Sequence, residues 1–568
     1  MEQWYLYCRK ADFSAISKRF NISPMLARIL VNRGIKTDRD IDMFLNAGPE
    51  SMYDPFLLKG MQEAVSLIRT ALGKHEKIRI IGDYDADGVC SAYILYHYLE
   101  FAGADVSVRL PDRVKDGYGM NEAMAVQAKE DGIGLIITCD NGISAQEAVA
   151  RAKRLGIKVI VTDHHMPPME LPDADVIIDP KQEGCAYPYK EICGAGVAYK
   201  LVCALAAVLK ERAGFDSGKI PDYLLQFAGI ATITDIVPLK DENRIFAKEG
   251  LKRLAVTENP GLKALMEERS VNANELSSYH ISFIIGPAIN SAGRLKSADI
   301  AFELFNEKDP EKAREKAKLL SQLNEERKKL TREQTETALI KAAEKTDKDK
   351  IVVIYLPDAH ESVAGIVAGK IKEETNRPAI VVTDSEEGLK GSGRSTDAYN
   401  IIEEISKYPE LFSKFGGHSK ACGFTLKASV QELSQTLNDN CLLTQKDLEK
   451  KVWIDMQLPF EYASEDFVNE LNLLEPFGME NERPLFAEKN ITCISSFIVG
   501  KNKNGLKLKL RNKNGTVMEG IMFSKSEELE KINDSIKAKE EISFTYYPEI
   551  NEFRNKKYVR LRIKSVKV

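Results

Sequence analysis

The chain has 568 residues, of which 43% are hydrophobic and 29% are charged, and this composition is typical of globular protein. Its formal net charge is −5, and no run of ~18 uninterrupted apolar residues is present to span a membrane. The N-terminus lacks the basic segment and long apolar stretch of a secretory signal. Nine cysteines, an odd number, argue for reduced thiols over a disulfide framework. These features disfavour membrane and secreted proteins, and we expect a cytoplasmic chain of about three to four domains.

The first 45 residues are predicted to be a helical lead-in, because the apolar residues 26–31 are followed by Asn32-Arg33-Gly34, which is a helix stop. From residue 46 to about 305, short runs rich in Val and Ile alternate with helical stretches such as 91–103 and 144–155. This alternation predicts βα units and a parallel sheet. In such a sheet the functional groups emerge at the carboxyl ends of the strands.

Three of these runs end in acidic or histidine clusters. The clusters are Asp83, Asp85 and Asp87 after residues 78–81, Asp140 and Asn141 after residues 135–139, and Asp163, His164 and His165 after residues 159–162. A fourth carboxylate, Asp235, follows the β-branched run 230–234, and we expect all four groups at one rim of the sheet.

An isolated Asp-Gly or Asp-Asn-Gly is most often a turn. Here the conjunction favours a site, because the chain has only seven histidines and two of them stand side by side at a strand end. Carboxylate and imidazole ligands together suit divalent cations such as Mn²⁺ and Mg²⁺, and side chains from several strand ends can hold two of them. The clusters therefore predict phosphoester chemistry.

Residues 306–350 are highly charged and nearly free of glycine and proline, with leucines at helical spacing, so we expect one long connecting helix. Residues 351–430 follow as a smaller α/β lobe, with strands at 351–355 and 379–383 and a helix at 362–374. This lobe contains Gly-Ser-Gly-Arg-Ser at residues 391–395 and Gly-Gly-His at residues 416–418. Amides, hydroxyls and a guanidinium suit a phosphate, although such a glycine-rich run is more often a plain loop.

The C-terminal region is basic and has the alternation of β-strands. Residues 501–568 contain 17 Lys and Arg against 9 Asp and Glu, so this segment carries +8 while the rest of the chain carries −13. Basic residues alternate there with apolar ones, which predicts strands with a basic face. We expect residues 450–568 to form an OB-like β-barrel that binds nucleic acid, with four candidate residues for stacking on bases: Phe544, Tyr546, Tyr547 and Phe553. The alternative is that the basic residues form an ordinary solvent-exposed face of the barrel and that the aromatic residues belong to its core.

At Asp163-His164-His165 the chain resembles the DHH phosphoesterase superfamily. The stretches 231–239, 286–295, 389–395 and 414–418 extend this to a resemblance to the RecJ single-strand-specific exonucleases, from about residue 45 to the C-terminus. The resemblance implies a fold of two α/β lobes, a long helix and an OB-like barrel. Two positions depart from the family pattern: Ala288 stands where arginine is common, and Ala359 precedes His360 where tryptophan is common. Neither departure removes a metal ligand.

The resemblance also implies a site assembled from both lobes. Two Mn²⁺ or Mg²⁺ ions would be held by Asp83, Asp85, Asp87, Asp140, His164 and Asp235, with Asp83 either a ligand or a neighbour of one. His165, Asn141 and Arg294 would act on the scissile phosphate. The second lobe would close over the substrate with His360, Ser392, Gly393, Arg394, Ser395, Gly416, Gly417 and His418.

By the same resemblance, the expected activity is stepwise hydrolysis of single-stranded DNA from its 5′ end, in DNA repair and recombination, by a monomer. A single-strand-binding protein and a RecQ-type helicase are the expected protein partners. A DHH phosphodiesterase of short oligonucleotides or cyclic dinucleotides and a catalytically inactive clamp are the alternatives. A dehydrogenase is disfavoured, because no Gly-x-Gly-x-x-Gly joins a first strand to a helix.

Overall fold

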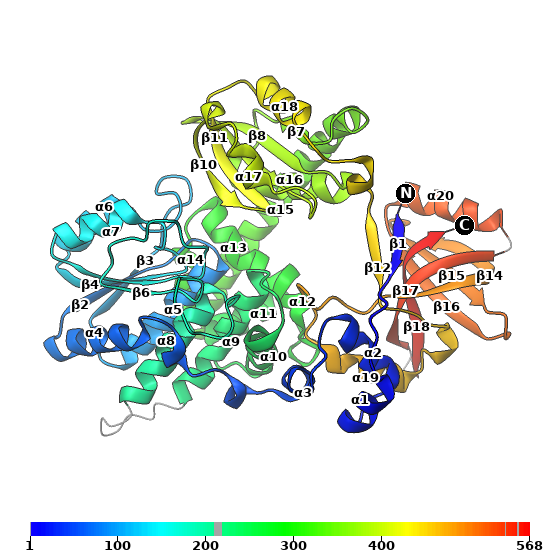
Figure 1. The fold of residues 1–568 in the computed structure, drawn as a ribbon, viewed down its shortest axis with the longest axis horizontal. Coiled ribbons are helices and arrows are strands. Elements are labelled where there is room, and N and C mark those ends of the chain that lie inside the picture. Colours follow the sequence, from blue (N-terminus) through cyan, green and yellow to red (C-terminus); the bar gives the residue numbers. More distant parts are fainter. Residues whose placement is uncertain (1, 210–218, 540, 554–555, 568) are drawn as a thin grey trace. The chain divides into compact units, whose positions relative to one another are not determined.

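The computed structural model describes residues 2–209, 219–539, 541–553 and 556–567, and the chain divides into two compact units (Figure 1). The larger unit consists of Met52–Val237 and Ile245–Lys450. The smaller unit consists of Met1–Ser51, Pro238–Arg244 and Lys451–Val568, three stretches that are far apart in sequence.

A parallel five-stranded sheet forms the first lobe of the larger unit. Its strand order is β3-β2-β4-β5-β6, with β2 (Lys77–Ile81), β3 (Val106–Arg109), β4 (Ile133–Cys139), β5 (Lys158–Thr162) and β6 (Val176–Ile178). β4 is buried along almost its whole length, as expected for a parallel strand covered on both faces. The strand order reverses at β2, which has β3 on one side and β4 on the other, and ligands bind at such switch points.

Helices cover both faces of this sheet. α6 (Glu122–Glu130) and α7 (Gln146–Arg154) pack on one face through a core that includes Ile136 and Val161. Other helices of the lobe are α4 (Met61–Lys74), α5 (Ala86–Phe101), α8 (Gly194–Leu209), α9 (Lys219–Thr234), α10 (Asp241–Ala255), α11 (Pro260–Glu268), α12 (Ser278–His280), η4 (Ile281–Ile285), α13 (Gly286–Leu295) and α14 (Asp299–Asn306). The predicted metal-binding α/β lobe is confirmed.

A single helix of 36 residues, α15 (Pro310–Lys345), leads to the second lobe, as the sequence predicted. There a five-stranded sheet has the order β10-β11-β9-β8-β7, in which only β7 and β8 are parallel. Its elements are β7 (Val352–Tyr355), α16 (Glu361–Thr375), β8 (Ala379–Ser385), β9 (Gly388–Arg394), α17 (Ile401–Ile405), β10 (Phe412–His418), β11 (Ala421–Leu426) and α18 (Val430–Asp439).

The smaller unit is built around a closed barrel. Its strands run β14-β15-β16-β18-β17, and β17 also pairs with β14, which closes the barrel with the order of an OB-fold. The bounds are β12 (Lys451–Ile454), β13 (Met456–Gln457), α19 (Glu465–Leu471), β14 (Phe486–Val499), β15 (Gly505–Arg511), β16 (Val517–Phe523), α20 (Ser526–Lys537), β17 (Glu541–Phe553) and β18 (Lys556–Lys567).

The N-terminal residues, which contain helices as predicted, belong to this unit. β1 (Gln3–Leu6) pairs in parallel with β12. The helices α1 (Phe13–Phe20), α2 (Pro24–Asn32) and α3 (Asp38–Asn46) follow it. Leu26 and Leu30 of α2 share one apolar core with Phe486 and Tyr546 of the barrel. The pairing partner of β1 lies more than 440 residues away, so no local pattern could reveal it.

Two expectations, for the run before Asp235 and for the aromatic residues of the barrel, are wrong in detail. The run 230–234 is the last part of α9 and not a strand, so Asp235 reaches the site from a helix end. Phe544 and Tyr546 are fully buried in the barrel core and cannot stack on bases, while Tyr547 is half-buried. The side chain of Phe553 lies outside the described residues.

Among the helices that the structure describes, none is both long and apolar enough to cross a membrane.

Candidate active site

The first strand-to-helix connection brings three carboxylates to the site. Asp85 caps α5, because its Oδ1 accepts hydrogen bonds from the backbone N–H groups of Asp87 (2.9 Å) and Gly88 (3.1 Å). Gly88 needs to lack a side chain, since a Cβ there would lie 2.5 Å from the backbone nitrogen of Asp83. This tight connection buries Asp83 and Asp87 and leaves Asp85 partly exposed.

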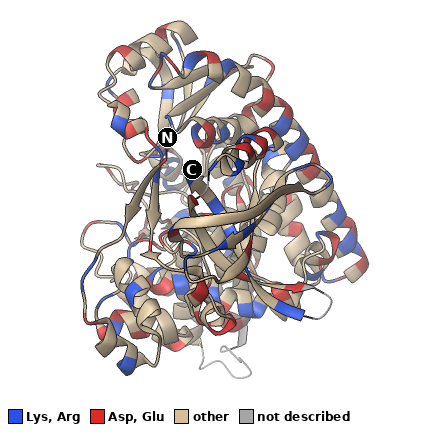
Figure 2. Cartoon of the chain, turned by 90° about the vertical axis from the view of Figure 1, so that its right-hand side faces the viewer, with Lys and Arg blue, Asp and Glu red and all other residues tan. Residues whose placement is uncertain are grey.

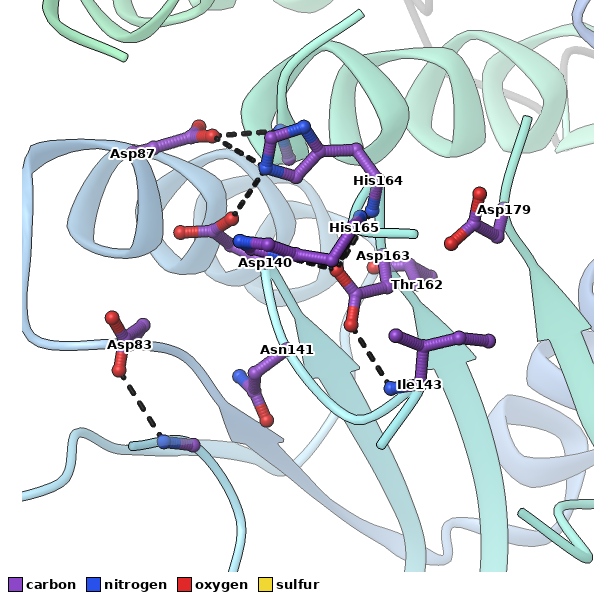
Figure 3. A network of polar contacts seen from close by, with 12 residues as sticks. Asp83, Asp87, Asp140, Asn141, Ile143, Thr162, Asp163, His164, His165 and Asp179 are labelled. Atoms are coloured by element: carbon purple, nitrogen blue, oxygen red, sulfur yellow. Dashed lines mark hydrogen bonds and ion pairs between the residues drawn. The ribbon is translucent and has the colours of Figure 1, made fainter. Parts of the chain in front are cut away.

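His164 lies among carboxylates from three different segments, and Figure 3 shows two of them, Asp87 and Asp140, beside its ring. Its Nε2 is 3.2 Å from an oxygen of Asp140, and 3.8 Å from an oxygen of Asp87 and of Asp235. Both ring nitrogens are buried, and neither has a hydrogen-bond partner among the described residues. A buried imidazole in this state fits a ligand that donates its lone pair to a metal ion.

Three groups of side chains each bring one possible ligand atom per residue to within 4.8 Å of one another. They are Asp83 with Asp85 and Asp140, Asp87 with His164 and Asp235, and Asp140 with His164 and His165. Asp140 belongs to the first group and lies next to His164 of the second. The six predicted metal ligands are therefore brought together in two neighbouring groups, whose oxygen and nitrogen donors suit two divalent cations.

The electrostatics of the cluster also fit bound cations. Burial, followed by repulsion from Asp87 and Asp85, raises the pKa of Asp140 well above its usual value. Burial and the same neighbours raise the pKa of Asp235 in the same direction. Burial lowers the pKa of His164 to about 3, so its ring is neutral at pH 7. Crowded buried carboxylates around a neutral imidazole need positive charge, which divalent ions would supply.

The N-terminus of α8 holds Asp87 in place. The sequence predicted Asp87 as a ligand but did not predict this contact with α8. The backbone N–H groups of Gly194 and Ala195 each donate to one oxygen of Asp87, both at 2.7 Å. Amides at a helix N-terminus stabilise a carboxylate. Gly194 also lets Asp140 approach, because a Cβ on Gly194 would lie 2.5 Å from Asp140 Cβ. The run of small residues at 194–196 was the available signal for this close approach.

Asp163 orients the two histidines and is absent from the ligand groups. Its Oδ1 accepts from the backbone N–H of His164 (2.7 Å) and lies 2.7 Å from Nδ1 of His165, while Oδ2 accepts from Ile143 N–H (2.9 Å). Burial opposes protonation of His165, but the hydrogen bond to Asp163 raises its pKa to about 9. Tyr118, which the sequence did not single out, donates to the Asp140 carbonyl (2.8 Å) and lies 3.1 Å from His165 Nδ1.

Asn141 braces the strand ends through hydrogen bonds to the backbone. Its side-chain nitrogen donates to the carbonyls of Ile81 (3.0 Å) and Cys139 (2.9 Å), and its oxygen accepts from Met120 N–H (3.1 Å). Both amide hydrogens are therefore used, and the residue is fully buried. The predicted contact of Asn141 with the phosphate stays a prediction; in this structure, backbone carbonyls at the ends of two strands accept both of its amide hydrogens.

The second lobe reaches the metal cluster through His418, at the end of β10. The rings of His165 and His418 are stacked, with centroids 5.7 Å apart and an interplanar angle of 16°. Gly417 precedes it with a φ of 143°, and a Cβ there would lie 2.3 Å from the Ala421 carbonyl oxygen. Gly416 is exposed on the same strand. Gly417 thus lets the strand bring His418 to its position.

Guanidinium groups gather beside the cluster. Arg294 donates to the Ser362 carbonyl (2.7 Å), which ties α13 to α16. Burial, followed by repulsion from Arg113, Arg327 and Arg394, lowers the pKa of Arg294 to about 9. Four arginines near one another in a buried place favour an anion such as a phosphate.

His360 caps α16, where its Nδ1 accepts from Ser362 N–H (3.3 Å).

Alternation along β9 divides the predicted substrate residues. Ser392 and Arg394 lie on one face, where Arg394 Nη1 is 3.5 Å from Ser392 Oγ. Gly393 and Ser395 point to the other face: a Cβ on Gly393 would lie 2.5 Å from Ile401, and Ser395 Oγ donates to the Tyr399 carbonyl (2.6 Å). Gly393 and Ser395 are buried in the lobe, whereas Ser392 and Arg394 are partly exposed, and the contact of these four residues with substrate stays a prediction.

Comparison with known proteins agrees with this architecture. Residues 77–231 match the DHH family, N-terminal domain; residues 348–442 match the DHHA1 domain; and residues 454–565 match the RecJ OB domain. The first two define a DHH-type two-lobed protein.

Relatives extend the match to nearly the whole chain. The single-stranded-DNA-specific exonuclease RecJ of Bacillus subtilis is 38% identical over 98% of this chain and 69% of its own length. That of Haemophilus influenzae is 35% identical over 95% of both. The crystal structure of RecJ in complex with Mn²⁺ from Thermus thermophilus has a TM-score of 0.84 at 26% identity, covering 100% of this chain and 79% of that one. The chain belongs to the RecJ family of single-stranded-DNA-specific exonucleases.

Proposed function

We propose that this protein is a metal-dependent exonuclease that hydrolyses single-stranded DNA stepwise from its 5′ end. The observation that carries the proposal is the convergence of Asp87, Asp140 and Asp235 around His164, whose buried ring nitrogens have no hydrogen-bond partner among the described residues. Family membership supplies the substrate class. The expected domain limits (1–45, 46–305, 306–350, 351–430 and 450–568) stay a prediction.

The metals would be Mn²⁺ or Mg²⁺, which solved RecJ structures of Thermus thermophilus contain. Asp83, Asp85 and Asp140 would hold one ion, and Asp87, His164 and Asp235 the other. Two such ions supply a water of lowered pKa and charge stabilisation for the attacking and leaving oxygens. The protein's own contribution is to fix the donors: the α8 amides hold Asp87, and Asp163 fixes the ring orientation of His165.

Residues of the second lobe support recognition of a phosphate. His418 stacks on His165, and Ser392 and Arg394 share one face of β9. Arg294 and Arg394 would bind the terminal 5′ phosphate, because a group of unneutralised guanidiniums favours the most highly charged phosphate of the strand. His360 and the exposed Gly416 would contact the strand behind it.

The barrel would bind the rest of the strand. On β15, Lys507, Lys509 and Arg511 alternate with the buried Leu508 and Leu510, as the sequence predicted. Figure 2 shows basic segments along barrel strands. Exposed aromatics lie on neighbouring strands: Phe523 is 44% exposed, with Arg562 Cζ 4.0 Å from its ring centroid. Basic side chains beside exposed rings suit a strand of DNA whose bases are unpaired.

The cellular setting follows the family. We expect the protein to act in DNA repair and recombination in the cytoplasm, as a monomer, on DNA exposed by a helicase of the RecQ type and coated by a single-strand-binding protein.

Digestion of end-labelled substrates tests the proposal. With Mn²⁺, a 5′-labelled single strand should release labelled mononucleotide at the earliest times, and a 3′-labelled strand should shorten progressively. A blunt duplex should resist, and EDTA should stop the reaction. Preference for dinucleotides or cyclic dinucleotides over long DNA would instead favour a small-substrate phosphodiesterase.

A further inference from the structure

Seven residues, Pro238–Arg244, belong to the smaller unit, although the residues on both sides of them belong to the larger one. They begin three positions after Asp235, whose carboxylate is 3.8 Å from His164. Leu239 N–H donates to the Met479 carbonyl at 2.9 Å, and Lys240 forms an ion pair with Glu480. The smaller unit thus holds this segment by backbone and ionic contacts.

Arg244 binds both other stretches of the smaller unit. Its guanidinium donates to four backbone carbonyls, those of Phe44 (2.7 Å), Leu473 (2.9 Å), Leu474 (3.0 Å) and Glu475 (2.8 Å). Its Cζ also lies 3.7 Å from the centroid of the Phe44 ring. The side chain is 2% exposed, so a guanidinium without these acceptors would be strongly unfavourable there. All three stretches of the smaller unit meet at this residue.

Between Asp235 and the segment, the backbone adopts an unfavourable conformation. Ile236 has a φ of 59°, in the left-handed region that β-branched residues avoid. Its side chain is 64% exposed, so its own packing does not account for this conformation. On its N-terminal side, Asp235 N–H donates to the Ala231 carbonyl at the end of α9 (2.8 Å). The conformation is therefore imposed by what holds the chain before and after it.

We propose that Arg244 is a positioning residue for the metal site. By anchoring Pro238–Arg244, it fixes the backbone conformation of the three residues 235–237, on which the direction of the Asp235 carboxylate depends. Arg244 contacts neither ligand nor substrate in this role. A lysine at this position has one ammonium group and cannot bridge four carbonyls, whereas the planar fork of arginine can. The inference rests on the proposed role of Asp235 as a metal ligand.

The test measures Mn²⁺ affinity by electron paramagnetic resonance on the full chain without DNA, together with the melting temperature. Ile236→Gly loosens the link while relieving the strain, because glycine accepts this φ but also many others. We expect affinity to fall about tenfold or more, as for other losses of support to a metal ligand, with the melting temperature nearly unchanged. Ile236→Asn, which tolerates the left-handed conformation but is less flexible, should retain most of the affinity.

Arg244→Lys should also lower Mn²⁺ affinity about tenfold, beyond what its loss of stability explains. Its matched control is Phe544→Leu, a barrel-core change in the same unit that lowers the melting temperature without touching the segment. That control should bind Mn²⁺ as the unaltered protein does. Equal affinities for Arg244→Lys and Phe544→Leu, or equal losses in Ile236→Gly and Ile236→Asn, would overturn the inference.

Asp235→Asn in the same assay separates this inference from the proposed function. If Asp235→Asn loses affinity while Ile236→Gly and Arg244→Lys retain it, the positioning role is refuted and the ligand role stands. If Asp235→Asn binds Mn²⁺ normally, Asp235 is not a ligand and the inference falls with that assignment.

Discussion

At the scale of the residue, Asp140 combines a proposed role in metal binding with a negative charge that the metal-free protein tolerates poorly. Because burial and neighbouring carboxylates raise its pKa, its ionised form is disfavoured when no cation is present. We expect Asp140→Asn to reduce turnover by about 10³-fold or more, which is about 4 kcal/mol of transition-state stabilisation. The melting temperature of the metal-free variant should be equal to or above that of the unaltered protein, since like-charge repulsion is removed.

Single-turnover hydrolysis and thermal melts with and without Mn²⁺ check this prediction. The unaltered protein should gain stability from Mn²⁺, and Asp140→Asn should lose most of that gain. Near-normal turnover of the variant in excess Mn²⁺ would refute the shared position of Asp140 between the two ligand groups.

The residue types at the site were visible in the sequence, but the roles of individual residues were less so. Asp87, Asp140 and His164 follow strands and meet as predicted. Asn141 is adjacent to Asp140, yet its amide bonds to backbone groups of β2 and β4. Whether the Asn141 amide reaches these backbone groups depends on how the two strands are aligned in three dimensions. The sequence could therefore not distinguish a structural role of Asn141 from a contact with substrate.

At the scale of the element, the barrel strands β15, β16 and β18 present the proposed DNA-binding face. We expect Phe523→Ala or Arg562→Ala to weaken binding of long single-stranded DNA about tenfold, because each loses a stacking or cationic contact. Cleavage of a very short oligonucleotide should change little. Fluorescence anisotropy with strands of both lengths measures this difference.

Lys531→Ala, on the exposed side of α20, is the matched control and should leave both properties nearly unchanged. An equal loss of affinity in the control would indicate diffuse charge attraction and not a defined face.

Period-two alternation located this face but misassigned its aromatic residues. Phe544 and Tyr546 belong to a strand whose alternate residues fill the barrel core, whereas Phe523 ends its strand exposed. Alternation shows that two faces exist, and only barrel closure decides which face is inside. The apolar run before Asp235 was misread for a similar reason, since a short β-branched run is compatible with a buried helix.

At the scale of the whole molecule, the smaller unit is built from three stretches, which makes simple truncation informative. Deletion of residues 451–568 would remove the carbonyl partners of Arg244 at residues 473–475 and the barrel side of the apolar core that α2 shares. We expect the truncated chain to melt at a lower temperature and to lose activity on short as well as long DNA. Calorimetry and digestion of a short oligonucleotide check this.

A truncated chain that cleaves short oligonucleotides at the normal rate would show that the larger unit is independent of the smaller one.

The order of lobes, long helix and barrel could be predicted because each is contiguous in sequence. The association of residues 1–51 and 238–244 with the barrel could not, because it depends on contacts between positions hundreds of residues apart.

The most direct test of the two-metal site is anomalous diffraction from crystals of the protein soaked in Mn²⁺. Two anomalous peaks should appear, one contacting Asp83, Asp85 and Asp140 and the other contacting Asp87, His164 and Asp235. A single peak, or peaks that do not touch His164, would contradict the proposed site.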